Sequence, residues 1–452
     1  MKIKNSLLLG WPISSQQNIR EPIYAKKSFT KNLRQKLSLA NAVRYSGDGH
    51  LITFAPTGAG KGVSTIIPTL LSYPGSTIVI DPKGENFLVT ARYRSEIGQK
   101  VYVLDPFKIV TPCTKYINKN KSIEFVEINS SSLNPLDFLI GLDQLDDSES
   151  QTIAVSLAER SGSNAFWDNL ATLLLTGLIQ LVVTSSDLPK SKKTLSTVVD
   201  ILFMDNFDEY IHDIVRYKNI DIFSKRALEG YLSAGVRKTR HEILSFARGY
   251  LGSLTTESIR HSISQTTIDL DELVSGGAVT VYIVFPASKL ESYSKLLRVW
   301  VTVLIRVILT RKNAPKMNTL FLLDECAQLG ELEQLRTAVT LLRGYGLQAW
   351  MFFQDLSQIK ERYHDWENIV NNCAVLQSFG LSRDMAAKPI AKLVGRFESE
   401  DLLGLGRYQQ LIAQTGVKPR IAELMTYWSD PAFSGRADKN DFVRDSEQKN
   451  KW

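Results

Sequence analysis

Two segments far apart in the chain restrict what it can fold into. The first is an apolar, β-prone stretch, residues 51–55, followed by Pro56-Thr57-Gly58-Ala59-Gly60-Lys61-Gly62 and a helical pattern over residues 63–71. A strand, a glycine-rich loop and a helix in this order predict a phosphate-binding loop, because glycines let successive backbone N–H groups surround phosphate oxygens. The start of the helix adds unpaired N–H donors, and Lys61 can reach the β and γ phosphates of a nucleotide.

This loop departs from the general pattern G-x-x-x-x-G-K-[ST] at both ends. Ala55 replaces the first glycine, and Gly62 replaces the serine or threonine that binds magnesium. On these residues alone, a plain turn is the alternative interpretation. If the loop binds a nucleotide, the expected contacts are Pro56, Thr57, Gly58, Ala59, Gly60, Lys61, Gly62 and Val63.

The second segment, Thr319 to Glu325, favours the nucleotide site. It is an apolar strand pattern that ends in two carboxylates. Asp324 suits a Mg²⁺ ligand, directly or through water, and Glu325 suits the base that orients or deprotonates a water for attack on the γ-phosphate. Together the two segments predict a P-loop ATPase that uses ATP and Mg²⁺.

Composition indicates a globular protein with more than one domain. The chain has 452 residues, of which 44% are hydrophobic and 22% charged. Its three cysteines form no close pair, which fits a reduced, cytosolic protein. The net charge of +7 lies in the first fifty residues, where nine Lys or Arg stand against two acidic residues. This basic segment suggests contact with anionic lipid, nucleic acid or an acidic partner, and a solvated face is the alternative.

The order of strand and helix patterns predicts an α/β fold with a mostly parallel sheet. Ligands of such sheets bind at the carboxyl ends of the strands, where Asp81, Asp105 and Asp324 are expected. Residues 142–268 show helical patterns only. The two most apolar helices, over 170–183 and 296–309, are interrupted by polar residues. We therefore expect them to be core helices and expect no transmembrane helix. The predicted organisation is a basic segment 1–50 with short strands near Ile23 and Val43, a nucleotide-binding domain 51–141 and 269–435, an all-α domain 142–268, and a polar, disordered tail 436–452.

Several motifs taken together resemble the type IV secretion coupling proteins, the TraG/TraD-like conjugation ATPases. In that family the phosphate loop also has Gly after Lys, as in Lys61-Gly62. The resemblance spans residues 50–435, although family members usually begin with two transmembrane helices, which are not expected here. The matching motifs are Ala55–Val63, Pro74–Asn86, Asn134–Asp137, Phe166-Trp167, Leu323–Gly330, Gly344–Gly346, Gln354–Gln358 and Tyr427–Pro431.

The resemblance implies a RecA-like motor that assembles as a homo-hexamer. It would hydrolyse ATP to transfer single-stranded DNA with its relaxase, or protein effectors, to a type IV secretion channel, and its all-α domain would select cargo and contact the relaxosome. Gln354 would sense the γ-phosphate, and Arg343, at the end of a helix expected over 331–343, would complete a neighbour's active site. The implied location is the cytoplasm, or the inner face of the bacterial membrane with an anchoring partner.

Other interpretations remain open. The protein could instead be a cytosolic DNA translocase of the FtsK/HerA type, or a nucleotide-dependent cargo scaffold that turns over slowly. Arg343 could merely cap its helix, and Gln354 could be a surface residue. Asp81, Lys83 and Glu85 could contact nucleotide or a neighbouring subunit, or form a polar turn that caps the next helix.

Overall fold

A sheet of eleven strands organises the molecule. The computed structural model describes residues 6–13, 39–119, 122–142, 146–158, 164–235, 237–331, 333–341 and 343–440. The strand order is β2-β1-β13-β12-β11-β3-β10-β9-β4-β8-β5. The strands from β11 to β5 run parallel, and β12, β13, β1 and β2 continue the sheet antiparallel. Their bounds are β1 (Leu7–Pro12), β2 (Val43–Tyr45), β3 (His50–Phe54), β4 (Thr77–Asp81), β5 (Lys100–Leu104), β8 (Val279–Val284), β9 (Thr319–Leu323), β10 (Leu347–Phe353), β11 (Cys373–Ser378), β12 (Gln409–Gln414) and β13 (Val417–Glu423).

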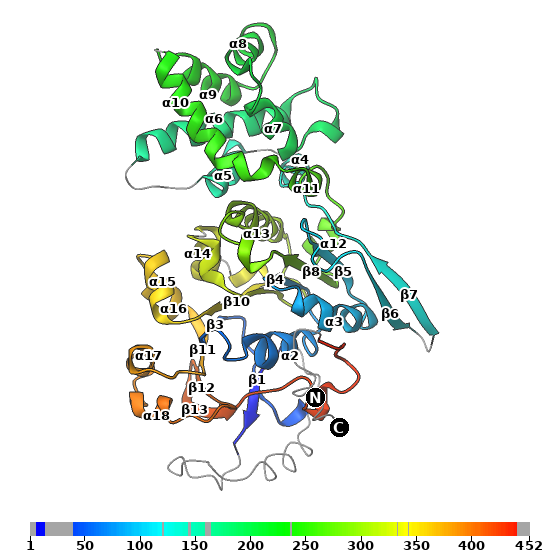
Figure 1. Cartoon of the computed structure of the whole chain (residues 1–452), viewed down its shortest axis with the longest axis vertical. Helices are drawn as coiled ribbons and strands as arrows, with labels where there is room; N and C mark the ends of the chain where they lie inside the picture. The colour runs from blue at the N-terminus through cyan, green and yellow to red at the C-terminus, as the bar shows by residue number, and fades with distance from the viewer. Residues whose placement is uncertain are drawn as a thin grey trace.

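Helices cover both faces of the parallel part, which explains why its central strands are apolar throughout. Figure 1 shows α2 and α3 on one side and α13 and α14 on the other. On β4, Val79 packs with Phe87 of α3, whereas Ile80 points to the opposite face and packs in the cluster that contains Trp300 of α13. The helices of this part are α2 (Ile67–Leu70), α3 (Glu85–Glu96), α12 (Leu270–Val274), α13 (Ser294–Leu309), α14 (Glu333–Leu341), α15 (Leu356–Arg362), α16 (Trp366–Asn371), α17 (Asp384–Val394) and α18 (Ser399–Leu403).

A group of helices between β7 and β8 lies at one end of the molecule, beyond α13 (Figure 1). Its central helix, α6, is the one described helix long and apolar enough to cross a membrane, but 67% of its most apolar window is buried inside the protein. α6 packs against α5, α9 and α10, as a core helix does. The helices are α4 (Asp137–Ile140), α5 (Asp147–Leu157), α6 (Ala165–Thr184), α7 (Leu195–Leu202), α8 (Phe207–Tyr217), α9 (Ile222–Leu232), α10 (Arg237–Leu251) and α11 (Glu257–Ser262).

Some strands were not expected from the sequence. β1 lies within residues 1–50 and pairs with both β2 and β13, so this part of the basic segment belongs to the main sheet. The strand expected near Val43 is β2, and the one expected near Ile23 lies outside the described residues. β12 and β13 form a hairpin, and β6 (Cys113–Lys119) and β7 (Ser122–Ile128) form a separate antiparallel pair.

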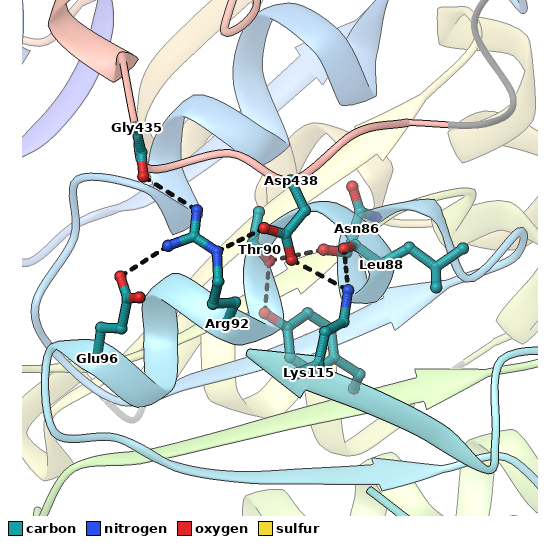
Figure 2. A network of polar contacts seen from close by, with 9 residues as sticks. Asn86, Leu88, Thr90, Arg92, Glu96, Lys115, Gly435 and Asp438 are labelled. Carbon is teal, nitrogen blue, oxygen red and sulfur yellow. Dashed lines mark hydrogen bonds and ion pairs between the residues drawn. The ribbon is translucent and has the colours of Figure 1, made fainter. Parts of the chain in front are cut away.

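The beginning of the predicted disordered tail is fixed to α3, which corrects that prediction. The Asp438 carboxylate pairs with Arg92 of α3 and, at 3.1 Å, with Lys115 of β6. The backbone N–H of Asp438 donates to the Val89 carbonyl at 2.9 Å. Figure 2 shows how Asp438 lies between the two cations. Residues 434–440, here called the C-terminal strap, therefore join α3 to the β6–β7 hairpin, and residues 441–452 lie outside the described part.

Candidate nucleotide-binding site

The predicted phosphate loop joins β3 to a helix. The helix begins at Gly62 as the π-helical turn η2 (Gly62–Ile66) and continues as α2, so the unpaired N–H groups of its first turn adjoin the loop. Gly58 and Gly60 have φ angles of 81° and 95°, which residues with a side chain rarely adopt. The N–H of Ala59 donates to the Pro56 carbonyl at 3.2 Å, and this bond closes the turn.

The loop after β11 supports the phosphate loop. β11 is a parallel neighbour of β3, and the Phe379 N–H donates to the Phe54 carbonyl at 3.3 Å. Gly380 has a φ of 72°, and a Cβ built on it would lie 2.5 Å from the Cβ of Ala59. Only glycine fits this close approach. Gly380 was not expected from the sequence, although a glycine close behind a buried strand is the signal that could have indicated it.

Three predicted residues meet in one hydrogen-bonded group. Lys61 Nζ donates to Glu325 Oε1 and to the Ala55 carbonyl, each at 3.2 Å. Gln354 Nε2 donates to the other carboxylate oxygen of Glu325 at 3.0 Å. The three side chains follow β3, β9 and β10, which are adjacent parallel strands with β10 in the middle. Parallel pairing therefore brings residues 264 positions apart into contact.

Glu325 has an unusual backbone conformation. Its φ is 53° and its ψ is 46°, in the left-handed region, which costs about 1–2 kcal/mol for a residue with a side chain. Such strain concentrates at functional sites because the surrounding structure must hold it in place. Here the conformation turns the chain directly after β9 and leads into η6 (Cys326–Leu329).

Two carboxylates, one buried and one partly buried, stand at the ends of neighbouring strands. Asp324 follows β9 and Asp81 ends β4, and the register pairs Leu323 with Ile80. Burial raises the pKa of Asp324 to about 6 and that of Asp81 to about 7. Asp81 accepts hydrogen bonds from the Phe87 N–H at 2.9 Å and from Asn86 Nδ2 at 3.3 Å, so its carboxylate caps the start of α3.

The other acidic residues of interest have structural partners. Asp105 accepts hydrogen bonds from the N–H groups of Ile109 and Val110 at 2.9 and 2.8 Å, and it thereby holds the turn after β5. Glu85 accepts a hydrogen bond from the side-chain amide of Asn440 in the C-terminal strap. The hydrogen bonds that Asp81 accepts at the start of α3 agree with the interpretation of the 81–86 segment as a capping turn.

The donors in the site fit a magnesium ion that is held largely by a nucleotide. Asp324 offers a partly buried carboxylate at a strand end, and no group of three or more His, Cys, Asp or Glu side chains converges among the described residues. Mg²⁺ is commonly bound through one or two carboxylates together with substrate phosphates and water. When bound, the ion would neutralise phosphate charge.

The structure corrects the position of Arg343. The helix expected over 331–343 is shorter, because α14 ends at Leu341, and Arg343 begins the 3₁₀ turn η7 (Arg343–Tyr345). The side chain of Arg343 lies outside the described part of the chain. Its contact with a neighbouring subunit therefore stays a prediction.

Comparison with known proteins identifies relatives of this chain. Residues 13–401 match the family model described as Type IV secretory system Conjugative DNA transfer. The conjugal transfer protein TraG of Escherichia coli is 26% identical over 376 residues, covering 78% of this chain and 56% of TraG. Protein VirD4 of Rhizobium radiobacter is 24% identical over 357 residues, covering 77% of this chain and 48% of VirD4. The chain thus spans about half the length of the curated relatives it matches.

A solved structure shows the same fold. The plasmid coupling protein TrwB, in complex with ADP and Mg²⁺, superposes with a TM-score of 0.64 at 16% identity, covering 94% of this chain and 96% of that chain. This likeness confirms the predicted α/β, RecA-like fold. The family match, over most of the chain, confirms the resemblance of the motifs. The chain belongs to the family of type IV secretory system conjugative DNA transfer proteins.

Proposed function

We propose that the protein is the ATP-driven coupling motor of a type IV secretion, or conjugation, system. It binds ATP with Mg²⁺, hydrolyses the nucleotide, and transfers single-stranded DNA with its relaxase, or protein effectors, to the secretion channel. The observation that carries the proposal is the convergence of Lys61, Glu325 and Gln354 at the carboxyl ends of three adjacent parallel strands. The family match and the likeness to TrwB, which was solved with ADP and Mg²⁺, support it.

The geometry gives each residue a role. Backbone N–H groups of residues 57–63 surround the phosphates, and Lys61 leaves Glu325 to contact the β and γ phosphates. Glu325, released from this ion pair, orients a water for attack on the γ-phosphate and accepts its proton. Gln354 holds the carboxylate by its 3.0 Å hydrogen bond and can exchange this bond for one to the attacking water. Asp324 holds the magnesium ion.

The motor works as a homo-hexamer in this proposal. Arg343 reaches the γ-phosphate bound to a neighbouring subunit, where a guanidinium stabilises the charge of the transition state. The helices from α5 to α11 select cargo and contact the relaxosome. The protein acts in the cytoplasm, at the inner face of the membrane, where the basic residues near the N-terminus bind anionic lipid or an anchoring partner.

The test is ATP hydrolysis by the purified protein with and without DNA. We expect single-stranded DNA to stimulate hydrolysis and Glu325→Gln to abolish it, whereas Glu361→Gln, on the exposed surface of α15, should behave as wild type. Co-purification with a relaxase supports the coupling function. Hydrolysis that responds to DNA without any relaxase contact would favour an FtsK/HerA-type translocase, and slow turnover that ignores DNA would favour a scaffold.

A further inference from the structure

The phosphate loop lacks an oxygen that the general pattern supplies. In that pattern the hydroxyl of a serine or threonine after the lysine contacts the magnesium ion. Gly62 has no side chain at this position. Outside the helix that holds Gly62, one atom lies within reach of the missing side chain, the amide oxygen Oδ1 of Asn86, 4.0 Å from a Cβ built on Gly62. A hydroxyl on that Cβ would come within hydrogen-bond distance of this oxygen.

The orientation of Asn86 is fixed by its other contacts. Its Nδ2 donates to Asp81 Oδ1 at 3.3 Å, so the amide nitrogen faces Asp81. The backbone carbonyl of Asn86 accepts from Thr90 Oγ1 at 2.6 Å, a contact that Figure 2 shows from close by. The amide oxygen is left to point toward Gly62.

This oxygen has no hydrogen-bond donor within the described part of the protein. The Asn86 residue as a whole is only 3% exposed. Although the residue as a whole is buried, the oxygen itself is in contact with solvent, so a metal-bound water could reach it. Capping of α3 does not explain it, since Asp81 already accepts the Phe87 N–H at 2.9 Å.

We propose that Asn86 supplies, from outside the phosphate loop, the oxygen that Gly62 cannot. The amide oxygen accepts a hydrogen bond from a water ligand of the nucleotide-bound magnesium ion, and Asp81 holds the amide in position. Asp324, the expected metal ligand, ends the strand next to the one that ends in Asp81, so these groups lie at the same edge of the sheet. Asn86 is a positioning residue in this arrangement, and the inference rests on the proposed binding of nucleotide with Mg²⁺.

The test measures metal binding itself. Mn²⁺ serves as the probe, and its affinity for the full-length protein saturated with ADP is followed by electron paramagnetic resonance. The affinity for ADP without metal is followed separately with a fluorescent ADP. Asn86→Ala should lower the Mn²⁺ affinity about tenfold and leave metal-free ADP binding unchanged. Asn206→Ala, at the exposed start of α8, is the matched control and should change neither.

A second substitution restores the oxygen from inside the loop. The double variant Gly62→Ser with Asn86→Ala should recover most of the Mn²⁺ affinity, since the serine hydroxyl then occupies the vacant position. Gly62→Ser alone should stay within about twofold of wild type, because Asn86 already fills this role. If Asn86→Ala does not fold, Gly62→Ser alone still tests the inference, because a tenfold gain in Mn²⁺ affinity would contradict it.

Three results would overturn the inference. They are wild-type Mn²⁺ affinity in Asn86→Ala, a loss in that variant that the serine does not restore, and a tenfold gain from Gly62→Ser alone. The last result would mean that the site lacks this oxygen altogether. If the wild-type protein itself binds no Mn²⁺ with ADP, the proposed function fails, and this inference fails with it.

Discussion

Replacing Glu325 by glutamine should tighten ATP binding while it removes hydrolysis. Lys61 donates to Glu325 at 3.2 Å, so the phosphates of a nucleotide must compete with this carboxylate for the lysine. Glutamine keeps the shape of the side chain and removes its charge. The change therefore weakens the competing contact and leaves the phosphate loop intact.

The size of the effect follows from the geometry. Two unit charges 3.2 Å apart attract by about 5 kcal/mol at an effective dielectric constant of about 20, before desolvation is counted. Desolvation cancels much of this, and hydrogen bonds to charged groups typically contribute about 1.5–3 kcal/mol. The Glu325 side chain is 20% exposed and the glutamine amide still accepts a hydrogen bond, so we expect a net gain in ATP binding of about 1 kcal/mol, or about fivefold in Kd.

The assay is a titration with fluorescent ATP without Mg²⁺, which prevents turnover, followed by an ATPase assay with Mg²⁺. Hydrolysis should fall by about 10² to 10⁴-fold, the usual contribution of a general base. Lys61→Ala removes the cation and should lose ATP binding, in contrast to the tighter binding expected of Glu325→Gln. Glu361→Gln controls for loss of a negative charge elsewhere. An ATP affinity in Glu325→Gln equal to or below that of wild type would refute the competition.

Three further predictions concern the same site. Burial raises the pKa of Asp324 to about 6, so its ionisation disfavours the folded state as the pH rises from about 4 to 6. Asp324→Asn should therefore have the melting temperature of wild type near pH 4 and a higher one above pH 6. A difference in melting temperature that does not change with pH would contradict this. Gly380→Ala should lower nucleotide affinity and stability more than Gly416→Ala. Both glycines have φ above 70°, but only at Gly380 would the added Cβ meet the phosphate loop. Equal losses of affinity and stability in the two variants would mean that the contact with the phosphate loop has no effect beyond the backbone strain. Mixing Arg343→Ala with Glu325→Gln, each inactive alone, should restore some ATPase activity, and a mixture that assembles but stays inactive argues against action across subunits.

The sequence predicts the nucleotide site well because short apolar strands and their carboxyl ends are local signals. Parallel strands align these ends at one edge, so Lys61, Glu325 and Gln354 could be expected together although they are far apart in the chain. The apolar helix expected over 296–309 likewise coincides with α13, which spans Ser294–Leu309. The apolar face of that helix repeats over three turns, which is a strong signal.

Features that depend on distant partners could not be predicted in the same way. β1 reads as a short apolar stretch that Gly10 and Pro12 interrupt, and only its pairing with β13 makes it a strand. Asp438 reads as part of a polar tail, because nothing near it in the sequence indicates Arg92 and Lys115. Gly380 and Asn86 acquire their importance from the phosphate loop that approaches them.

The pairing of β1 with β13 has a consequence for synthesis of the protein. Trp11 Nε1 donates to Asp430 Oδ2 at 2.7 Å, and the two residues are 419 positions apart. At 5–20 residues per second the ribosome needs roughly 20–80 s to make the intervening chain. Until then only β2 is available to β1, and a two-stranded pair alone is marginally stable. The apolar side chains of Leu7, Leu9 and Trp11 therefore stay accessible to chaperones until the last strand of the sheet emerges.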